Sequence, residues 1–280
     1  MLRSPAIIVG LVIVAALLIL SIGAPYISPH DPFQVTLADR LLPPFWMEGG
    51  SSTYPLGTDP VGRDILSWII WGTRTSFLLS AFLVLISTAI GTALGIVSGY
   101  LGGRVDTLIM RVVDFTMAFP IILFALMLAV IMGPSILTVS LVICSHLWAG
   151  FARMARGETL RVKNSDFIDA AKVMGVSKFK IMLRHIFPNT VTPIVVLVTL
   201  NIGRTALFIS TLSFLGAGIP TNIPDWGNMI NVGRPYLFRA PWVTLIPSVA
   251  ILVVVLCFNI LGDRLNEYLN PEVRAKIHAR

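Results

Sequence analysis

Six long apolar runs constrain this chain more than any other feature of its sequence. They cover residues 5–24, 76–97, 112–133, 137–152, 191–215 and 243–261. A helix needs about 20 apolar residues to cross a hydrocarbon core roughly 30 Å thick, so each run is a candidate span. Charged residues make up 12% of the chain, about half of their usual share in soluble domains. We therefore expect an all-α integral membrane protein with six transmembrane helices.

The basic residues gather on one side of these spans. The loop 153–189 carries eight Lys or Arg residues against three acidic ones, and further basic residues are Arg3, Arg104, Arg111, Arg264, Arg274, Lys276 and Arg280. Because cytoplasmic loops are enriched in Lys and Arg, both termini are expected in the cytoplasm and residues 26–75 outside it. This distribution accounts for the net charge of +7, so membrane lipid, and not nucleic acid, is the expected surrounding.

The loop 164–189 is the most charged stretch inside this apolar chain. Its pattern predicts a short helix with an apolar stripe of Phe167, Ala170, Ala171 and Met174. Gly175 ends that helix, and a second helix runs from a Ser177 cap to a stop at Pro188. Two interpretations are open: the loop lies among lipid headgroups, or it docks into a groove on another protein. The small alanine pair favours docking.

The stretch "DAAKVMGVSKFKIMLRHIFPN" resembles the EAA loop of ABC importer permeases. Asp169, Ala170, Ala171, Gly175 and Pro188 match that motif, with Asp at a position that is usually Glu. In that family the hairpin is the coupling helix, which docks into a cleft of a cytoplasmic ATPase. The resemblance therefore implies a set of ATPase-coupling residues: Phe167, Asp169, Ala170, Ala171, Met174 and Gly175.

Other stretches resemble the "C"-type permeases of peptide and nickel importers. They are "LGTDPVGRDILSWIIWGTR", where Trp68 replaces the usual Arg, "GGRVDTLIMRVVDFTMAFP", "SFLGAGIP", "PDWGNMI" and "FNILGDRLNEYLNP". This resemblance implies a type I ABC importer permease fold in the bacterial inner membrane, with a five-helix core after the first span. The implied divisions are a first span with an external segment (1–75), the core (76–271, coupling loop 153–189) and a cytoplasmic tail (272–280).

The resemblance also implies partners and a substrate class. The partners are a second, "B"-type permease, two cytoplasmic ABC ATPases and a periplasmic or lipid-anchored substrate-binding protein. Since the chain has no GxxxxGK[ST] motif, it is expected to be no enzyme and to hold no cofactor, with ATP and Mg²⁺ bound by the ATPases. Dipeptides or oligopeptides are the expected substrates; nickel chelates and glutathione are the alternatives within this family.

Two smaller features have open interpretations. Asp59, Arg63 and Asp64 lie in a turn-rich external loop, where they form a local ion pair or a docking site for the binding protein. Asn201 and Arg204 lie in the fifth span, where an unpaired arginine costs at least about 2.5 kcal/mol. This pair is therefore assigned to the translocation pathway or to subunit pairing.

Ser87, Gly91, Gly95 and Gly99 recur every four residues and predict a groove for a closely packed helix. The partner helix lies in this chain or in a second subunit. An ion-driven secondary transporter is the alternative of a different class. It would carry acidic or histidine residues deep in its spans, together with inverted repeats. No carboxylate lies deep in any span, no repeat is seen, and no catalytic or metal-binding constellation converges; His146 in the fourth span is assigned to packing.

Overall fold

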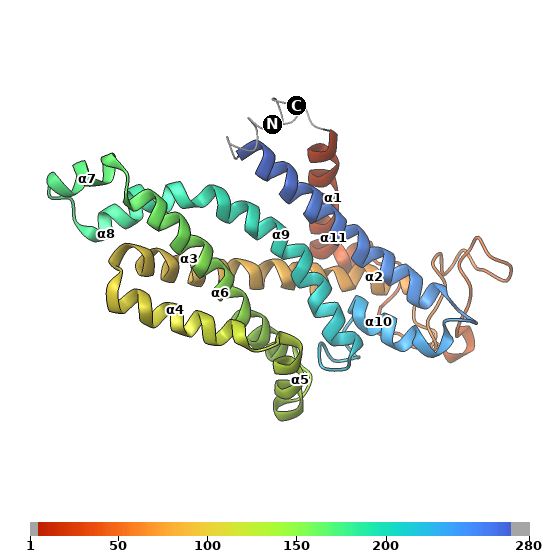
Figure 1. The fold of residues 1–280 in the computed structure, drawn as a ribbon. Coiled ribbons are helices and arrows are strands. Elements are labelled where there is room, and N and C mark those ends of the chain that lie inside the picture. The colour runs from red at the N-terminus through yellow and green to blue at the C-terminus, as the bar shows by residue number, and fades with distance from the viewer. Residues whose placement is uncertain (1–4, 270–280) are drawn as a thin grey trace. The chain divides into compact units, whose positions relative to one another are not determined.

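The computed structural model describes residues 5–269 (Figure 1). Arg3, Arg274, Lys276, Arg280 and the expected tail 272–280 lie outside the described residues. Every regular element of the described part is helical: α1 (Pro5–Ile27), α2 (Ile65–Thr73), α3 (Leu79–Leu101), α4 (Gly103–Ala118), α5 (Ile121–Met132), α6 (Ile136–Lys163), α7 (Asp166–Val173), α8 (Lys178–Ile181), α9 (Phe187–Phe214), α10 (Trp226–Gly233) and α11 (Trp242–Leu269). Two π-helical turns, Arg74–Leu78 and Met182–Ile186, make α2–α3 and α8–α9 continuous.

The described residues contain five helices that are long and apolar enough to cross a membrane, and six if the bent pair α4–α5 is one span. The predicted start of the second span at residue 76 is wrong, because this helix begins at Ile65. The fifth begins at Lys178 instead of residue 191. The added start of the fifth helix is charged sequence. The added start of the second helix, ILSWIIWGT, is itself apolar and is separated from the predicted span by Arg74.

The third predicted span, residues 112–133, is not one helix. The chain bends by 81° between α4 and α5. Phe119 is extended there, with φ −87° and ψ 128°. Pro120 follows it, and a residue before proline avoids the helical region while proline itself lacks the N–H of a helix interior. The apolar run therefore crosses a break that Pro120 marks in the sequence.

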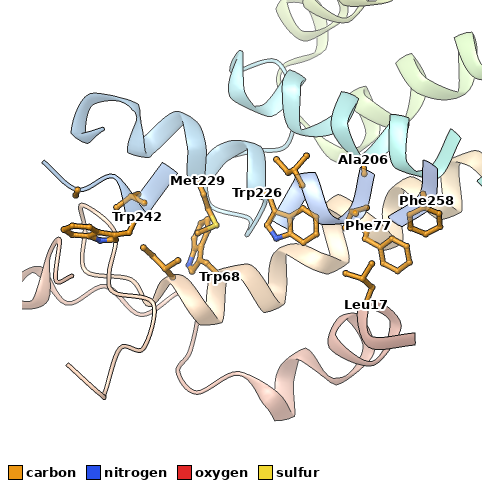
Figure 2. Close-up of a cluster of buried hydrophobic side chains, with 13 residues drawn as sticks. Leu17, Trp68, Phe77, Ala206, Trp226, Met229, Trp242 and Phe258 are labelled. Carbon is orange, nitrogen blue, oxygen red and sulfur yellow. The ribbon is translucent and has the colours of Figure 1, made fainter. Parts of the chain in front are cut away.

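The chain forms two compact units. The first comprises residues 5–82, 125–140 and 202–261. Its core is rich in large aromatic side chains, labelled in Figure 2: Trp68, Phe77, Trp226, Trp242 and Phe258. The buried indoles also use their N–H groups, since Trp68 donates to the Pro32 carbonyl and Trp226 to that of Ile69 at 3.1 Å. These bonds fasten the loop 28–64 and α10 to α2.

The second unit comprises residues 83–124, 141–201 and 262–269. Within it α3 packs closely on α6. A Cβ added at Gly91 would overlap the Trp148 carbonyl, and one at Gly95 would overlap that of Ala152. The predicted glycine groove is confirmed, and its partner is a helix of this same chain.

Candidate coupling site

The charged loop forms a hairpin of α7 and α8, which Figure 1 shows beyond the ends of α6 and α9. Ser165 is the N-cap of α7, although its hydroxyl donates back to the Val162 carbonyl at 2.5 Å and makes no cap bond. Gly175 turns the chain with φ +74°, in the left-handed region that glycine enters freely. Ser177 caps α8 by accepting from the Lys180 N–H. The predicted helix–glycine–helix hairpin is confirmed.

The predicted end of the hairpin at Pro188 is wrong. The helix continues through this proline into α9, because a π-helical turn precedes it, with the Phe187 N–H donating to the Met182 carbonyl. In a regular α-helix the proline ring would clash with the carbonyl of Arg184 and leave that carbonyl without a donor. The π-helical turn is wider, so the proline ring fits into the helix at this point. The hairpin is therefore attached to α9 without a flexible joint.

The inner face of the hairpin packs on the long helices of its own unit. Ile168 and Ala171 of α7 are buried, as are Ile181 and Ile186. They form one cluster with side chains of α3, α6 and α9: Ile96, Tyr100, Ala155, Val162 and Ile194. Burial of this many branched apolar side chains makes the hairpin part of the rigid unit instead of a loose loop.

The predicted docking stripe is therefore divided between two faces. Ala171, expected to face a partner, is only 2% exposed and packs in the cluster just described, three residues after Ile168. Its placement on the partner-facing stripe is corrected. Ala170 is exposed, Phe167 is 49% exposed and Met174 is 75% exposed. Because α7 is apolar on both faces, the sequence pattern did not separate the inner from the outer one.

The outer face of the hairpin exposes large apolar side chains that nothing in the described chain covers. Val173, which the sequence reading did not single out, is 89% exposed beside Met174. Asp169 lies on the rim of this face and pairs with Lys172 at 2.8 Å. A contiguous exposed apolar surface with a charged rim is typical of a protein-docking site.

Asn201 and Arg204 lie on neighbouring turns of α9. The Asn201 side chain donates to the Leu197 carbonyl of its own helix at 2.8 Å. Arg204 is exposed, and the structure records no ion pair or hydrogen bond for its guanidinium within the described residues. A charge exposed midway along an apolar helix requires water or a partner group. The roles assigned to the pair stay predictions.

Asp59, Arg63 and Asp64 hold the loop between α1 and α2 together. Arg63 Nε donates to Asp59 Oδ2 at 2.6 Å, and its guanidinium lies 3.9 Å from the ring centroid of Trp68. Asp64 is 2% exposed; it accepts from the N–H groups of Leu66 and Ser67 as the N-cap of α2. The local ion pair is thus confirmed for Arg63 and Asp59. Docking of a binding protein at these residues stays a prediction.

An apolar groove of about 680 Å³ lies in the second unit between α3 and the segment from α8 to α9. Its α3 wall combines small side chains, including Ala89, Thr92 and Ala93, with the larger Leu85 and Ile96. This is a different face of α3 from the glycine face that packs on α6. The helix therefore has two contact surfaces, and α6 fills the first of them.

Comparison with known families shows to which protein family the chain belongs. Residues 91–275 match the model described as "Binding-protein-dependent transport system inner membrane component". The chain belongs to this family. Residues 1–44 match a second model, the "N-terminal TM domain of oligopeptide transport permease C". The chain is thus a permease component of the inner membrane, as the resemblance of its coupling loop implied.

Curated relatives and a solved structure agree with this assignment. The dipeptide transport system permease protein DppC of Haemophilus influenzae is 39% identical over 95% of this chain and 90% of its own length. The glutathione transport system permease protein GsiD of Pectobacterium atrosepticum is 40% identical over 94% of this chain and 85% of its own length. The MetNI methionine ABC transporter in an inward-facing conformation shares the fold, with a TM-score of 0.53, 16% identity, and coverage of 72% of this chain and 97% of that one. The expected ABC importer permease fold is confirmed.

Proposed function

We propose that this chain is the permease subunit of an ATP-driven importer of short peptides. It pairs with a second permease and works with two cytoplasmic ATPases and an external substrate-binding protein. One observation supports this most strongly: the hairpin exposes Val173 and Met174 on its outer face while its inner face is built into the helical core. The exposed outer face can bind a partner. The buried inner face then couples movement of that partner to the spans.

The coupling mechanism follows from the two faces of the hairpin. The outer face, with Phe167, Ala170, Val173 and Met174, enters a cleft of an ATPase. When the ATPases close on ATP, the hairpin moves with them. The buried cluster around Ile168 carries this movement to α3, α6 and α9, and the permease alternates between its two access states. ATP and Mg²⁺ are bound by the ATPases, and the permease chain holds neither.

The substrate class rests on the relatives. A dipeptide permease and a glutathione permease match this chain at nearly equal identity, 39% and 40%. Glutathione is itself a tripeptide, so both names describe short peptides with free carboxylates. We assign dipeptides as the first substrate, glutathione as the second and nickel chelates as the third. Uptake of a labelled dipeptide by the reconstituted complex, in competition with glutathione and a nickel chelate, orders the three; uptake of the chelate alone contradicts the peptide assignment.

From the distribution of Lys and Arg we assign the basic loop and both termini to the cytoplasm. In a variant without Cys144 and Cys257, single cysteines at Ser52 and Ser177 are treated with an impermeant thiol reagent on whole cells. Labelling at position 52 is expected. Labelling at position 177 but not at 52 contradicts the orientation.

The docking surface is tested by placing a charge on it. Met174→Glu adds a carboxylate to the exposed apolar face without touching the buried cluster, so the chain still folds and inserts. We expect the ATPases no longer to co-purify with the permease pair. Lys172→Gln, on the rim, is the control and is expected to retain them. Wild-type ATPase binding and uptake in Met174→Glu would show that the hairpin docks elsewhere.

A further inference from the structure

A polar cluster joins three helix ends beside the hairpin. Asp106 of α4 accepts two hydrogen bonds from Arg156 of α6, from Nε at 2.5 Å and from Nη2 at 2.7 Å. The hydroxyl of Ser98, on α3, donates to the same carboxylate at 2.5 Å. The two charged side chains are mostly buried, with 21% of Asp106 and 32% of Arg156 exposed. A bidentate arginine–carboxylate pair fixes orientation as well as distance.

A second contact joins the ends of α3 and α6. The ammonium group of Lys163, the last residue of α6, donates to the Tyr100 carbonyl at 2.6 Å. Helix α3 has no basic residue in its own last turn. Lys163 therefore supplies the positive charge that the free carbonyls at the end of α3 favour. The ends of α3 and α6 are thus joined by a cation in addition to their glycine packing.

The link between α3 and α4 is built of glycine. It consists of Gly102 and Gly103, both with positive φ, of 68° and 54°. A Cβ added at either would meet nothing within 4 Å, so no neighbouring side chain restrains this link. Its backbone is held by the Gly102 N–H, which donates to the Ser98 carbonyl, and by the Gly102 carbonyl, which accepts from the Asp106 N–H. Because glycine has the widest backbone freedom, this link is the pivot at which α4 can turn relative to α3. The polar cluster fixes the direction in which α4 leaves α3, together with a buried apolar contact of Val113 on α4 with Ala149 and Ala152 on α6.

The hairpin lies directly on these joined ends. Tyr100, whose carbonyl Lys163 holds, belongs to the buried cluster beneath the hairpin. Val162, the neighbour of Lys163, belongs to it too. Movement of the hairpin therefore reaches α3 and α6 first. It reaches α4, and the bent pair α4–α5, through the contacts of α4 with α6: the apolar contact of Val113 and the polar cluster.

We propose that Asp106 and Arg156 are positioning residues for transport, and that their ion pair locks the glycine pivot so that hairpin movement turns α4 together with α3 and α6. Without the pair, only the apolar contact of Val113 holds α4 to α6, and the glycine link absorbs part of the movement. The ATPases then still bind and hydrolyse ATP, but fewer peptides cross for each ATP. This inference rests on the proposed coupling function, and it adds the residues through which the movement reaches the broken span.

The structure supplies a matched control. Arg153 and Asp114 form a second ion pair between the same two helices, α6 and α4, at 2.8 Å. This pair is exposed, 53% for Arg153 and 63% for Asp114, and it has one contact in place of two. Solvent-exposed pairs of this kind contribute little. Asp114→Asn is therefore the control for Asp106→Asn.

The experiment uses the complete complex in proteoliposomes, with peptide uptake and ATP hydrolysis measured in parallel. Asp106→Asn is expected to lower the number of peptides transported per ATP several-fold, while the ATPases co-purify in wild-type amount. Arg156→Lys keeps the charge but loses the bidentate contact, so its ratio is expected to be intermediate. Asp114→Asn is expected to keep the wild-type ratio.

Three outcomes overturn the proposal. The ratio of Asp106→Asn could equal that of wild type in an intact complex. The ratio of Asp114→Asn could fall equally far, which would make any charge change on these helices harmful. Asp106→Asn could also lose the ATPases, which would make the pair part of docking. Failure of the docking function itself is separate, because it is read from ATPase co-purification with Met174→Glu.

Discussion

Replacing Gly175 isolates the backbone turn of the hairpin from its packing. This residue has φ +74°, and a Cβ built on it would meet no heavy atom within 4 Å. The free-energy cost of a side chain there therefore comes from the backbone conformation alone. For an L-residue in the left-handed region that cost is about 1–2 kcal/mol. Asn, which enters this region more readily, is expected to cost less than Ala, and the β-branched Val more.

This energy acts on local opening of the hairpin. A change of about 1–2 kcal/mol alters an equilibrium by roughly 5–30-fold. The amide of Gly175, which donates to Lys172, and that of Val176, which donates to Ala171, report on this opening. Hydrogen exchange of both amides in the purified complex is expected to quicken from wild type through Gly175→Asn and Gly175→Ala to Gly175→Val. Retention of the ATPases should fall in the same order.

Gly157 provides the control for this series. It too has open space around a would-be Cβ, but it lies within α6 and has no positive φ. Gly157→Ala is therefore expected to leave the hairpin amides unchanged and to stabilise α6 slightly. Equal exchange in Gly175→Val and wild type would refute the reasoning. So would a Gly157→Ala effect as large as that of Gly175→Ala, since crowding or helix changes would then explain both.

Two further predictions concern single charges. Arg204→Leu is expected to leave membrane insertion intact, because it removes a cost of at least about 2.5 kcal/mol. It is expected to lower uptake or the yield of the complex, and Arg204→Lys is expected to lower them less. Wild-type uptake and yield in Arg204→Leu would contradict both assigned roles. Burial raises the pKa of the Asp225 carboxyl, which accepts from the N–H of Asn228 and the hydroxyl of Ser76. A raised folded-state pKa means that the stability contribution is full below the unfolded value of about 4 and is lost as the pH rises through the folded value. Asp225→Asn is therefore expected to gain melting temperature relative to wild type as the pH rises, and a constant difference across pH would contradict this.

The sequence predicted the spans well and their ends poorly, for a physical reason. Hydropathy detects residues that suit a hydrocarbon core, and it is insensitive to helix that continues beyond that core. Helix α6 therefore continues past residue 152 through charged sequence to Lys163. The early start of the helix that contains α3 has another cause, since the apolar segment ILSWIIWGT continues into it across Arg74. Pro120 alone does not predict the break, because Pro193 and Pro247 lie inside α9 and α11 without ending them.

Other features depended on contacts that no local pattern contains. The four-residue spacing of Gly91, Gly95 and Gly99 correctly predicted close helix packing, yet it was silent on the partner, since α6 lies some fifty residues further along the chain. Trp68, which stands where the family usually has Arg, is explained only by its neighbours. Its indole donates to Pro32, and its ring lies beneath Arg63.

The hairpin shows most clearly where periodicity stops being informative. An eight-residue helix with Phe167, Ala170 and Met174 on one side and Ile168 and Ala171 on the other is apolar on both. Spacing assigns residues to faces, but only the cluster under α7 shows which face is internal. The distinction changes how variants are read. A bulky residue at Ala171 disturbs the cluster that transmits movement, whereas one at Ala170 or Met174 disturbs the docking surface. Loss of transport with ATPases still bound is therefore expected for Ala171→Leu, and loss of the ATPases themselves for Met174→Glu.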